Sequence, residues 1–145
     1  MNVSKKILSI FSLIVFTSVL VAFNGKDPWS KNQIISPELL AQKLKLSKEL
    51  QPMIINIGGV GSIKNSIEIG AMTEKENVAK LKKLLRNTPQ TKEIVIYCGC
   101  CPFANCPNIR PAFNLLIEQH FTNAKLLNLP NNLKVNWIDK GFPMD

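Results

Sequence analysis

The chain has 145 residues, of which 46% are hydrophobic and 19% are charged, and its formal net charge is +8 at pH 7. This composition is typical of one globular domain with a hydrophobic core, and it excludes a disordered tail, a collagen-like fibre and a low-complexity repeat protein. The lysines are scattered and are not interleaved with aromatic residues, so we expect no nucleic-acid partner. The positive charge instead favours small anions.

An N-terminal targeting segment is predicted in residues 1–22. Two lysines precede an uncharged apolar run that ends at Ala22, which is the layout of a secretory signal peptide. We expect cleavage after Ala22, a linker over residues 23–32 and a domain over residues 33–145 that lies in the periplasm or is secreted. An uncleaved membrane anchor is the alternative, and contact with a membrane is expected only in that case.

The rest of the chain alternates helix and strand signals. Ser36 is expected to cap a helix that has Pro37 in its first turn. The further predicted elements are, in order, a strand at 53–57, a short strand at 68–69, a helix at about 74–86, a strand at 93–97, a helix at 109–121 and a strand at 124–129. This alternation predicts an α/β fold with a parallel sheet and helices on both faces.

All four cysteines lie in residues 98–107, immediately after the most apolar predicted strand. In open parallel sheets, ligands bind at the carboxyl ends of the strands, where a loop leads into the next helix. Structural disulfides stabilise more when they close a longer loop, so staples are better spread along a chain than gathered in one loop. The cysteine cluster is therefore interpreted as a chemical site.

Three chemistries fit this cluster, and the residues alone leave all three open. Cys98 stands at the strand end, where loop N–H groups and the next helix N-terminus favour a nucleophilic thiolate. Cys98 and Cys101 also form a Cys-x-x-Cys motif before Pro102, as in thiol–disulfide exchange. Thiolates would suit zinc or cuprous copper as well, but the spacing is not that of a usual zinc ribbon, so we assign no metal ligand.

The sequence resembles the rhodanese (sulfurtransferase) family over roughly residues 33–143. The segment Ile94–Cys98 is similar to the strand that precedes the family's catalytic cysteine, and residues 137–143 resemble its closing Trp followed by Gly-Tyr-Pro. The likeness is strongest to secreted single-domain members with the segments CGCCPF and CPNIRPAF, which are here Cys98–Phe103 and Cys106–Phe113. The resemblance implies a rhodanese-like α/β fold with a parallel sheet and helices on both faces.

The resemblance also implies an enzyme in which Cys98 accepts a sulfane sulfur from a small anionic donor, such as thiosulfate, and passes it from a persulfide to a thiol or to cyanide. The resemblance implies that loop N–H groups and a nearby positive charge bind the substrate. The N–H groups would come from Gly99, Cys100, Cys101, Phe103, Ala104 and Asn105, and the charge from Arg110. In a redox variant, Cys100, Cys101 or Cys106 would resolve a disulfide with Cys98, with Cys101 and Cys106 preferred. We expect no cofactor and a monomer. A periplasmic thiol–disulfide redox protein, or a thiolate metal-binding module that uses the same loop, is the alternative.

Two positions depart from the family pattern. Asn56 stands where the family usually has Asp, and Gly58 stands where it often has Arg. The loop from Cys98 to the next helix is also longer than the family's usual cradle. These departures leave the physiological sulfur donor and acceptor open.

Overall fold

The computed structural model describes residues 27–145, and the predicted signal peptide at residues 1–22 lies outside the described residues. In chain order the main elements are β1 (Ile34–Ile35), α1 (Pro37–Lys43), β2 (Met53–Asn56), β3 (Ser66–Glu68), α2 (Lys75–Arg86), β4 (Ile94–Tyr97), α3 (Ile109–Glu118) and β5 (Ala124–Leu127). Short helices in the described chain are η1 (Lys31–Gln33), η2 (Lys48–Leu50), η3 (Phe103–Asn105) and η4 (Lys134–Ile138). Within residues 27–145, no helix has both the length and the apolar character needed to cross a membrane.

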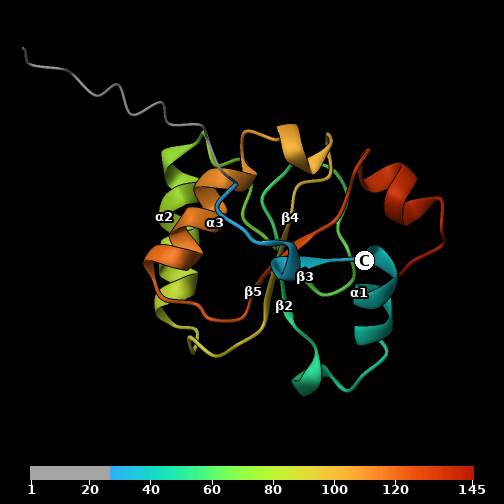
Figure 1. Ribbon diagram of the computed structural model, residues 1–145, viewed down its shortest axis with the longest axis horizontal. Helices are drawn as coiled ribbons and strands as arrows, with labels where there is room; N and C mark the ends of the chain where they lie inside the picture. Colours follow the sequence, from blue (N-terminus) through green and yellow to red (C-terminus); the bar gives the residue numbers. More distant parts are fainter. Residues whose placement is uncertain (1–26) are drawn as a thin grey trace, which may run out of the picture.

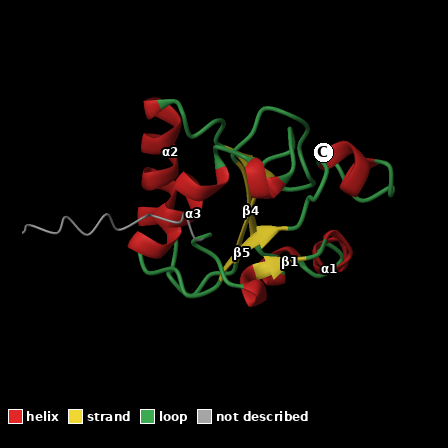
Figure 2. Ribbon diagram, turned by 45° about the horizontal axis from the view of Figure 1, so that its top comes forward, coloured by secondary structure: helices red, strands yellow, loops and turns green. Residues whose placement is uncertain are grey.

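The strands form one parallel sheet in the order β1-β5-β4-β2-β3, with β4 at its centre. Helices α2 and α3 cover one face, and α1 and η4 cover the other (Figures 1 and 2). Every residue of β4 is buried, because paired strands flank it on both sides and helices cover both faces. The expected α/β class with a parallel sheet and helices on both faces is confirmed.

The side chains of β4 divide between the two layers of core. Ile94 and Ile96 pack under α2 and α3, whereas Val95 and Tyr97 pack against α1 and η4. Cys98, the residue after the strand, belongs to the same core layer as Ile94 and Ile96. The alternation of the strand therefore directs the first cysteine toward the layer that contains α3.

Local signals explain where most elements begin. The Ser36 side chain accepts a hydrogen bond of 3.2 Å from the backbone N–H of Leu39, and Pro37 occupies the first turn of α1, so the predicted cap is confirmed. The prediction for α3 extended too far, because His120 adopts a φ of 62° and the helix ends before it. Strand β1 was not predicted, since two residues are too short to produce a period-2 pattern.

Both tryptophans are packing residues. Trp29 lies within the segment predicted as a linker, yet it is 7% exposed and its ring centroid is 5.7 Å from that of Phe113 and 6.3 Å from that of Phe103. Trp137 is fully buried, and its Nε1 donates a hydrogen bond of 3.0 Å to the carbonyl of Pro143. The chain segments before β1 and after β5 therefore both contribute to the core.

Candidate active site

The loop after β4 gathers three of the four cysteines. The Sγ atom of Cys98 lies 3.3 Å from the Sγ of Cys100, and the Sγ atoms of Cys98, Cys100 and Cys106 all lie within 4.8 Å of one another. Cys98 and Cys106 are buried, whereas Cys100 is exposed. The cluster therefore has two thiols in the core and one at the surface.

Cys101 lies at the outer side of this cluster. Its Sγ is 3.4 Å from that of Cys100, and the residue is half-buried. Of the two cysteines that were preferred as partners of Cys98, Cys106 joins its cluster, whereas Cys101 interacts with Cys100 and Cys106. The sulfur of Cys100 lies 3.3 Å from that of Cys98, although Cys100 was not one of the two preferred partners.

Backbone hydrogen bonds fix the loop to the segment that follows β5. The N–H of Leu133 donates to the carbonyl of Gly99 at 3.0 Å, and the N–H of Phe103 donates to the carbonyl of Leu129 at 3.1 Å. The ring of Phe103 also contacts Trp29. These bonds hold the long loop at Gly99 and at Phe103. They fix the position of the loop relative to the sheet.

Two glycines allow the close approach of neighbouring loops at this site. A Cβ atom at Gly58 would lie 2.8 Å from the Sγ of Cys98, and one at Gly99 would lie 2.8 Å from the carbonyl oxygen of Val60. Contacts this short are not tolerated, so both positions require glycine in this conformation. A glycine at position 58, where the family that the sequence resembles often has arginine, therefore has a steric reason, although Gly58 was not predicted as a site residue.

Asn108 is a second site residue that the sequence analysis did not assign. An asparagine just before a helix usually caps it, but the Asn108 side chain makes no capping hydrogen bond to α3. Its Oδ1 accepts a hydrogen bond of 2.9 Å from the N–H of Met72, and its Nδ2 lies 3.8 Å from the Sγ of Cys98. Because the Met72 N–H can only donate, it fixes the amide orientation and turns the NH₂ group toward the sulfur.

The surroundings of Cys98 favour its thiolate form and lower its pKa to about 5. The thiol of Cys106 contributes most to this shift; burial opposes it, and the N–H and thiol of Cys100 and the Asn108 amide contribute further. Burial, followed by the hydrogen bond to Cys98, raises the pKa of Cys100 to about 12. The interaction with Cys98, followed by burial, raises the pKa of Cys106. These contacts therefore favour the thiolate form at Cys98 and the neutral thiol at Cys100 and Cys106.

The other predicted substrate-binding residues lie further out. Ala104 and Asn105 are exposed on η3, and the N–H of Asn105 donates to the carbonyl of Pro102 at 3.0 Å, as in an ordinary turn. The N–H of Phe103 is also used, by Leu129. Among the predicted loop donors, the N–H of Cys100 is the one that acts on the Cys98 sulfur.

The positive charge of Arg110 has a partner away from the cysteines. Its Nη2 forms an ion pair with Oδ1 of Asp27, and its guanidinium carbon lies 5.4 Å from the centroid of the Trp29 ring. The Arg110 side chain is 39% exposed. These contacts direct the guanidinium toward the segment before β1.

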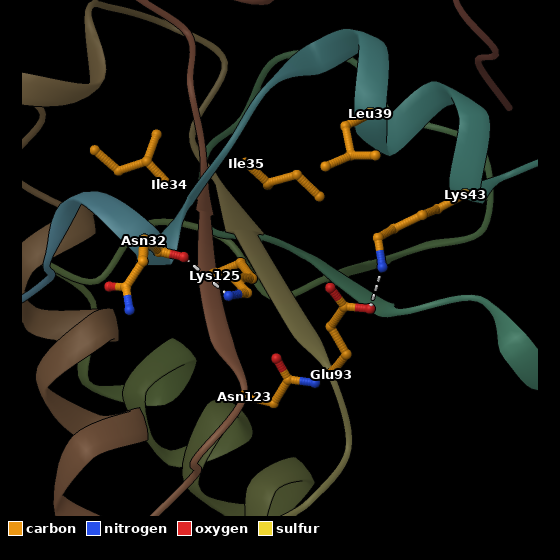
Figure 3. A pocket seen from close by; sticks show the side chains of 8 residues that line it. All are labelled: Asn32, Ile34, Ile35, Leu39, Lys43, Glu93, Asn123 and Lys125. Atoms are coloured by element: carbon orange, nitrogen blue, oxygen red, sulfur yellow. Dashed lines mark hydrogen bonds and ion pairs between the residues drawn. The ribbon is translucent and has the colours of Figure 1, made fainter.

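A surface hollow of about 390 Å³ lies at the other end of the sheet (Figure 3). It is lined by residues that precede or begin the strands and by α1, namely Asn32, Ile34, Ile35, Leu39, Lys43, Glu93, Asn123 and Lys125. Its two lysines are engaged, since Lys43 pairs with Glu93 at 2.8 Å and Lys125 donates to the carbonyl of Asn32 at 2.9 Å. The cysteine cluster lies instead at the carboxyl end of β4, where parallel sheets bind their ligands.

The fold and the cluster together define an α/β domain with a thiol site at the carboxyl end of its central strand. No family model matches the sequence, and no curated protein matches it either. Among solved structures, the fold is similar to wild-type EanB and to a cysteine-to-serine variant of EanB in complex with hercynine. In both cases the TM-score is 0.57 and the identity 18%, over 78% of this chain and 27% of the EanB chain. This chain thus spans about a quarter of the length of EanB, and the similarity concerns the fold.

Proposed function

We propose that the protein is a rhodanese-like sulfurtransferase that carries a sulfane sulfur as a persulfide on Cys98. The observation that carries this proposal is the position of the Cys98 sulfur, which follows the central strand and receives hydrogen bonds from Cys106, Cys100 and Asn108. These contacts stabilise a thiolate, and the thiolate is the form of cysteine that attacks sulfur.

The proposed reaction has two halves, and both occur at the same sulfur atom. In the first half, the Cys98 thiolate attacks the outer sulfur of a donor such as thiosulfate; an S–S bond forms on Cys98, the S–S bond of the donor breaks, and sulfite leaves with the electron pair. In the second half, a thiol or cyanide attacks the outer sulfur of the persulfide and the Cys98 thiolate leaves. The low pKa of Cys98 favours this departure.

Access to Cys98 passes the side chain of Cys100. Cys98 is 0% exposed, whereas the adjacent Cys100 reaches solvent. The backbone of Gly58 packs directly against the Cys98 sulfur. Under this proposal, donor and acceptor approach from the side of Cys100, the exposed member of the cluster.

The short distance between two sulfur atoms favours a second candidate function, dithiol–disulfide exchange. Cys98 and Cys100 lie 3.3 Å apart and are both free thiols. A thiolate next to a thiol is the reduced form of such a pair, and an external disulfide would serve as the oxidant. In this case Cys98 attacks the external disulfide, and Cys100 then displaces the mixed disulfide to leave a Cys98–Cys100 bond.

Intact-mass measurement separates these functions. Reduced, metal-free protein is treated with thiosulfate and then with cyanide. We expect a gain of one sulfur atom that cyanide removes, that Cys98→Ser abolishes and that the matched variant Cys101→Ser retains. A loss of two hydrogen atoms with an external disulfide, and no gain with thiosulfate, would support dithiol exchange and overturn sulfur transfer.

A further inference from the structure

The three clustered cysteines direct their sulfur atoms to one point. Each offers one Sγ, and the three atoms lie within 4.8 Å of one another, with 3.3 Å between Cys98 and Cys100. Cys98 and Cys106 come from the two ends of the loop and are both fully buried, whereas Cys100 closes the group from the solvent side. Such convergence of three soft donors is a feature that sulfur transfer by Cys98 alone does not require.

The distances match those of a metal ion bound by sulfur. With metal–sulfur bonds of about 2.3 Å, the sulfur atoms are about 4.0 Å apart around a trigonal ion and about 3.8 Å apart around a tetrahedral ion. The 3.3 Å between the sulfur atoms of Cys98 and Cys100 is shorter than these values, and the limit of 4.8 Å on all sulfur pairs of the cluster is longer. Cys100 is the exposed member of the group, so its side chain has room to adjust.

The groups around the sulfur atoms suit a thiolate site as well. Asn108 serves two of them, since its side-chain NH₂ faces Cys98 at 3.8 Å and its backbone N–H donates to Cys106. N–H groups that donate to ligating atoms hold the ligands in place and are typical of metal centres. Gly58 packs against the Cys98 sulfur, and Cys100 is the member of the group that is exposed to solvent.

We propose that Cys98, Cys100 and Cys106 form a three-coordinate site for a soft, thiophilic metal ion, with Cu(I) as its occupant. Sulfur ligands select Cu(I) and zinc from the common metals. Structural zinc takes four protein ligands, whereas the three sulfur atoms that all lie within 4.8 Å of one another here are those of Cys98, Cys100 and Cys106, and Cys101 lies beside Cys100 and Cys106 without joining that group. Binding releases the thiol protons to solvent and leaves the oxidation state of the copper unchanged.

The metal site does not depend on the proposed function, and only its consequence for catalysis rests on that function. An ion bound to Cys98 occupies the electron pair that would attack a sulfur donor. Copper-loaded protein is therefore inactive in sulfur transfer, and removal of the copper restores the transfer. The cluster thus has two mutually exclusive forms: the metal-free form accepts sulfur, and the metal-bound form does not.

The test is a titration of the reduced full chain with Cu(I) in competition with a chromophoric Cu(I) chelator. We expect one Cu(I) per chain and a loss of affinity of about 100-fold or more in Cys100→Ser and in Cys106→Ser. Cys101→Ser is the matched control and keeps the wild-type affinity. X-ray absorption of the copper-loaded wild type is expected to give three sulfur neighbours, and this measurement does not depend on how well the variants fold.

Two results would overturn the copper site. One is Cu(I) binding by the wild type that is no tighter than binding by Cys98→Ser. The other is a preference for Zn(II) that Cys101→Ser removes, which would indicate a four-coordinate zinc site instead. A failure of persulfide formation leaves the copper titration unaffected, so the failures of the two proposals are distinguishable.

Discussion

Gly58 and Cys98 are packed so closely that a Cβ atom on Gly58 would lie 2.8 Å from the Cys98 sulfur. The same atom would lie 3.2 Å from the backbone nitrogen of Gly99. The turn after β2 thus forms the inner wall of the cysteine site. The side chain of Asn56 fixes this turn, because its Oδ1 accepts a hydrogen bond of 2.9 Å from the N–H of Gly58.

Gly58→Ala is expected to damage the site more than the fold. The added methyl group forces Cys98 away from its hydrogen-bond partners, so we expect at least a tenfold slower gain of sulfur from thiosulfate and a loss of stability of about 1–3 kcal/mol. Gly59→Ala is the matched control, because a Cβ at Gly59 has nothing within 4 Å. Mass spectrometry over time gives the loading rate. Equal rates for the two variants would show that Gly58 is not part of the site.

Asn56→Asp tests why asparagine stands at this position, where the family that the sequence resembles usually has aspartate. Asn56 is 1% exposed, and its Nδ2 donates to the carbonyl of Gly61 at 3.0 Å and to Oε1 of Glu68 at 3.1 Å. A carboxylate cannot donate either bond and would face the charge of Glu68. We therefore expect a loss of about 2 kcal/mol in the free energy of unfolding, measured with urea.

The control for this prediction changes the partner of the carboxylate. In the double variant Asn56→Asp with Glu68→Gln, the glutamine amide can donate to the new carboxylate, so part of the lost stability is expected to return. If the single variant is as stable as the wild type, the buried amide network does not explain the choice of asparagine.

The sequence predicted the parts of the fold that depend on local patterns. The apolar run of β4, the Ser36 cap and the start of α3 at Ile109 were all visible from neighbouring residues. The roles of Gly58 and Asn108 were not visible, because they depend on contacts between segments that are far apart in the chain. The one signal in the sequence was Gly58 itself, a glycine at a position where the family that the sequence resembles often has arginine.

The candidate site, like the fold, could be predicted only where the order of residues along the chain determines it. The position of the cysteines after the central strand followed from the chain order of the elements, but the sulfur neighbours of Cys98 did not. Spacing alone does not say that Cys106 folds back to Cys98 while Cys101 stays outside. Arg110 had been assigned to the substrate as a charge close in sequence, whereas its partner, Asp27, lies before β1.

Replacing Asn108 is expected to raise the pKa of the Cys98 thiol above about 5. The amide donates to the sulfur, which favours the charged form, so its removal in Asn108→Leu favours the neutral thiol. Asn108→Asp keeps an acceptor for the Met72 N–H but places a negative charge beside the thiolate, so it also raises the pKa. The measurement is a pH titration followed by the ultraviolet absorbance of the thiolate, with protein that also carries Cys101→Ser. Its midpoint gives the pKa. An unchanged midpoint in Asn108→Asp would mean that Asn108 acts only on the backbone of Met72.

Mild oxidation of the reduced, metal-free protein is expected to join Cys98 to Cys100 or to Cys106 and not to Cys101. The reason is distance, because a disulfide needs sulfur atoms about 2 Å apart and the sulfurs of Cys100 and Cys106 are those that share the cluster with Cys98. Peptide mapping under acidic, non-reducing conditions identifies the bond, since acid stops thiol exchange. In Cys101→Ser the same bond is expected to form at an unchanged rate. A Cys98–Cys101 bond as the main product would contradict the arrangement of the loop and restore the pairing preferred from the Cys-x-x-Cys motif.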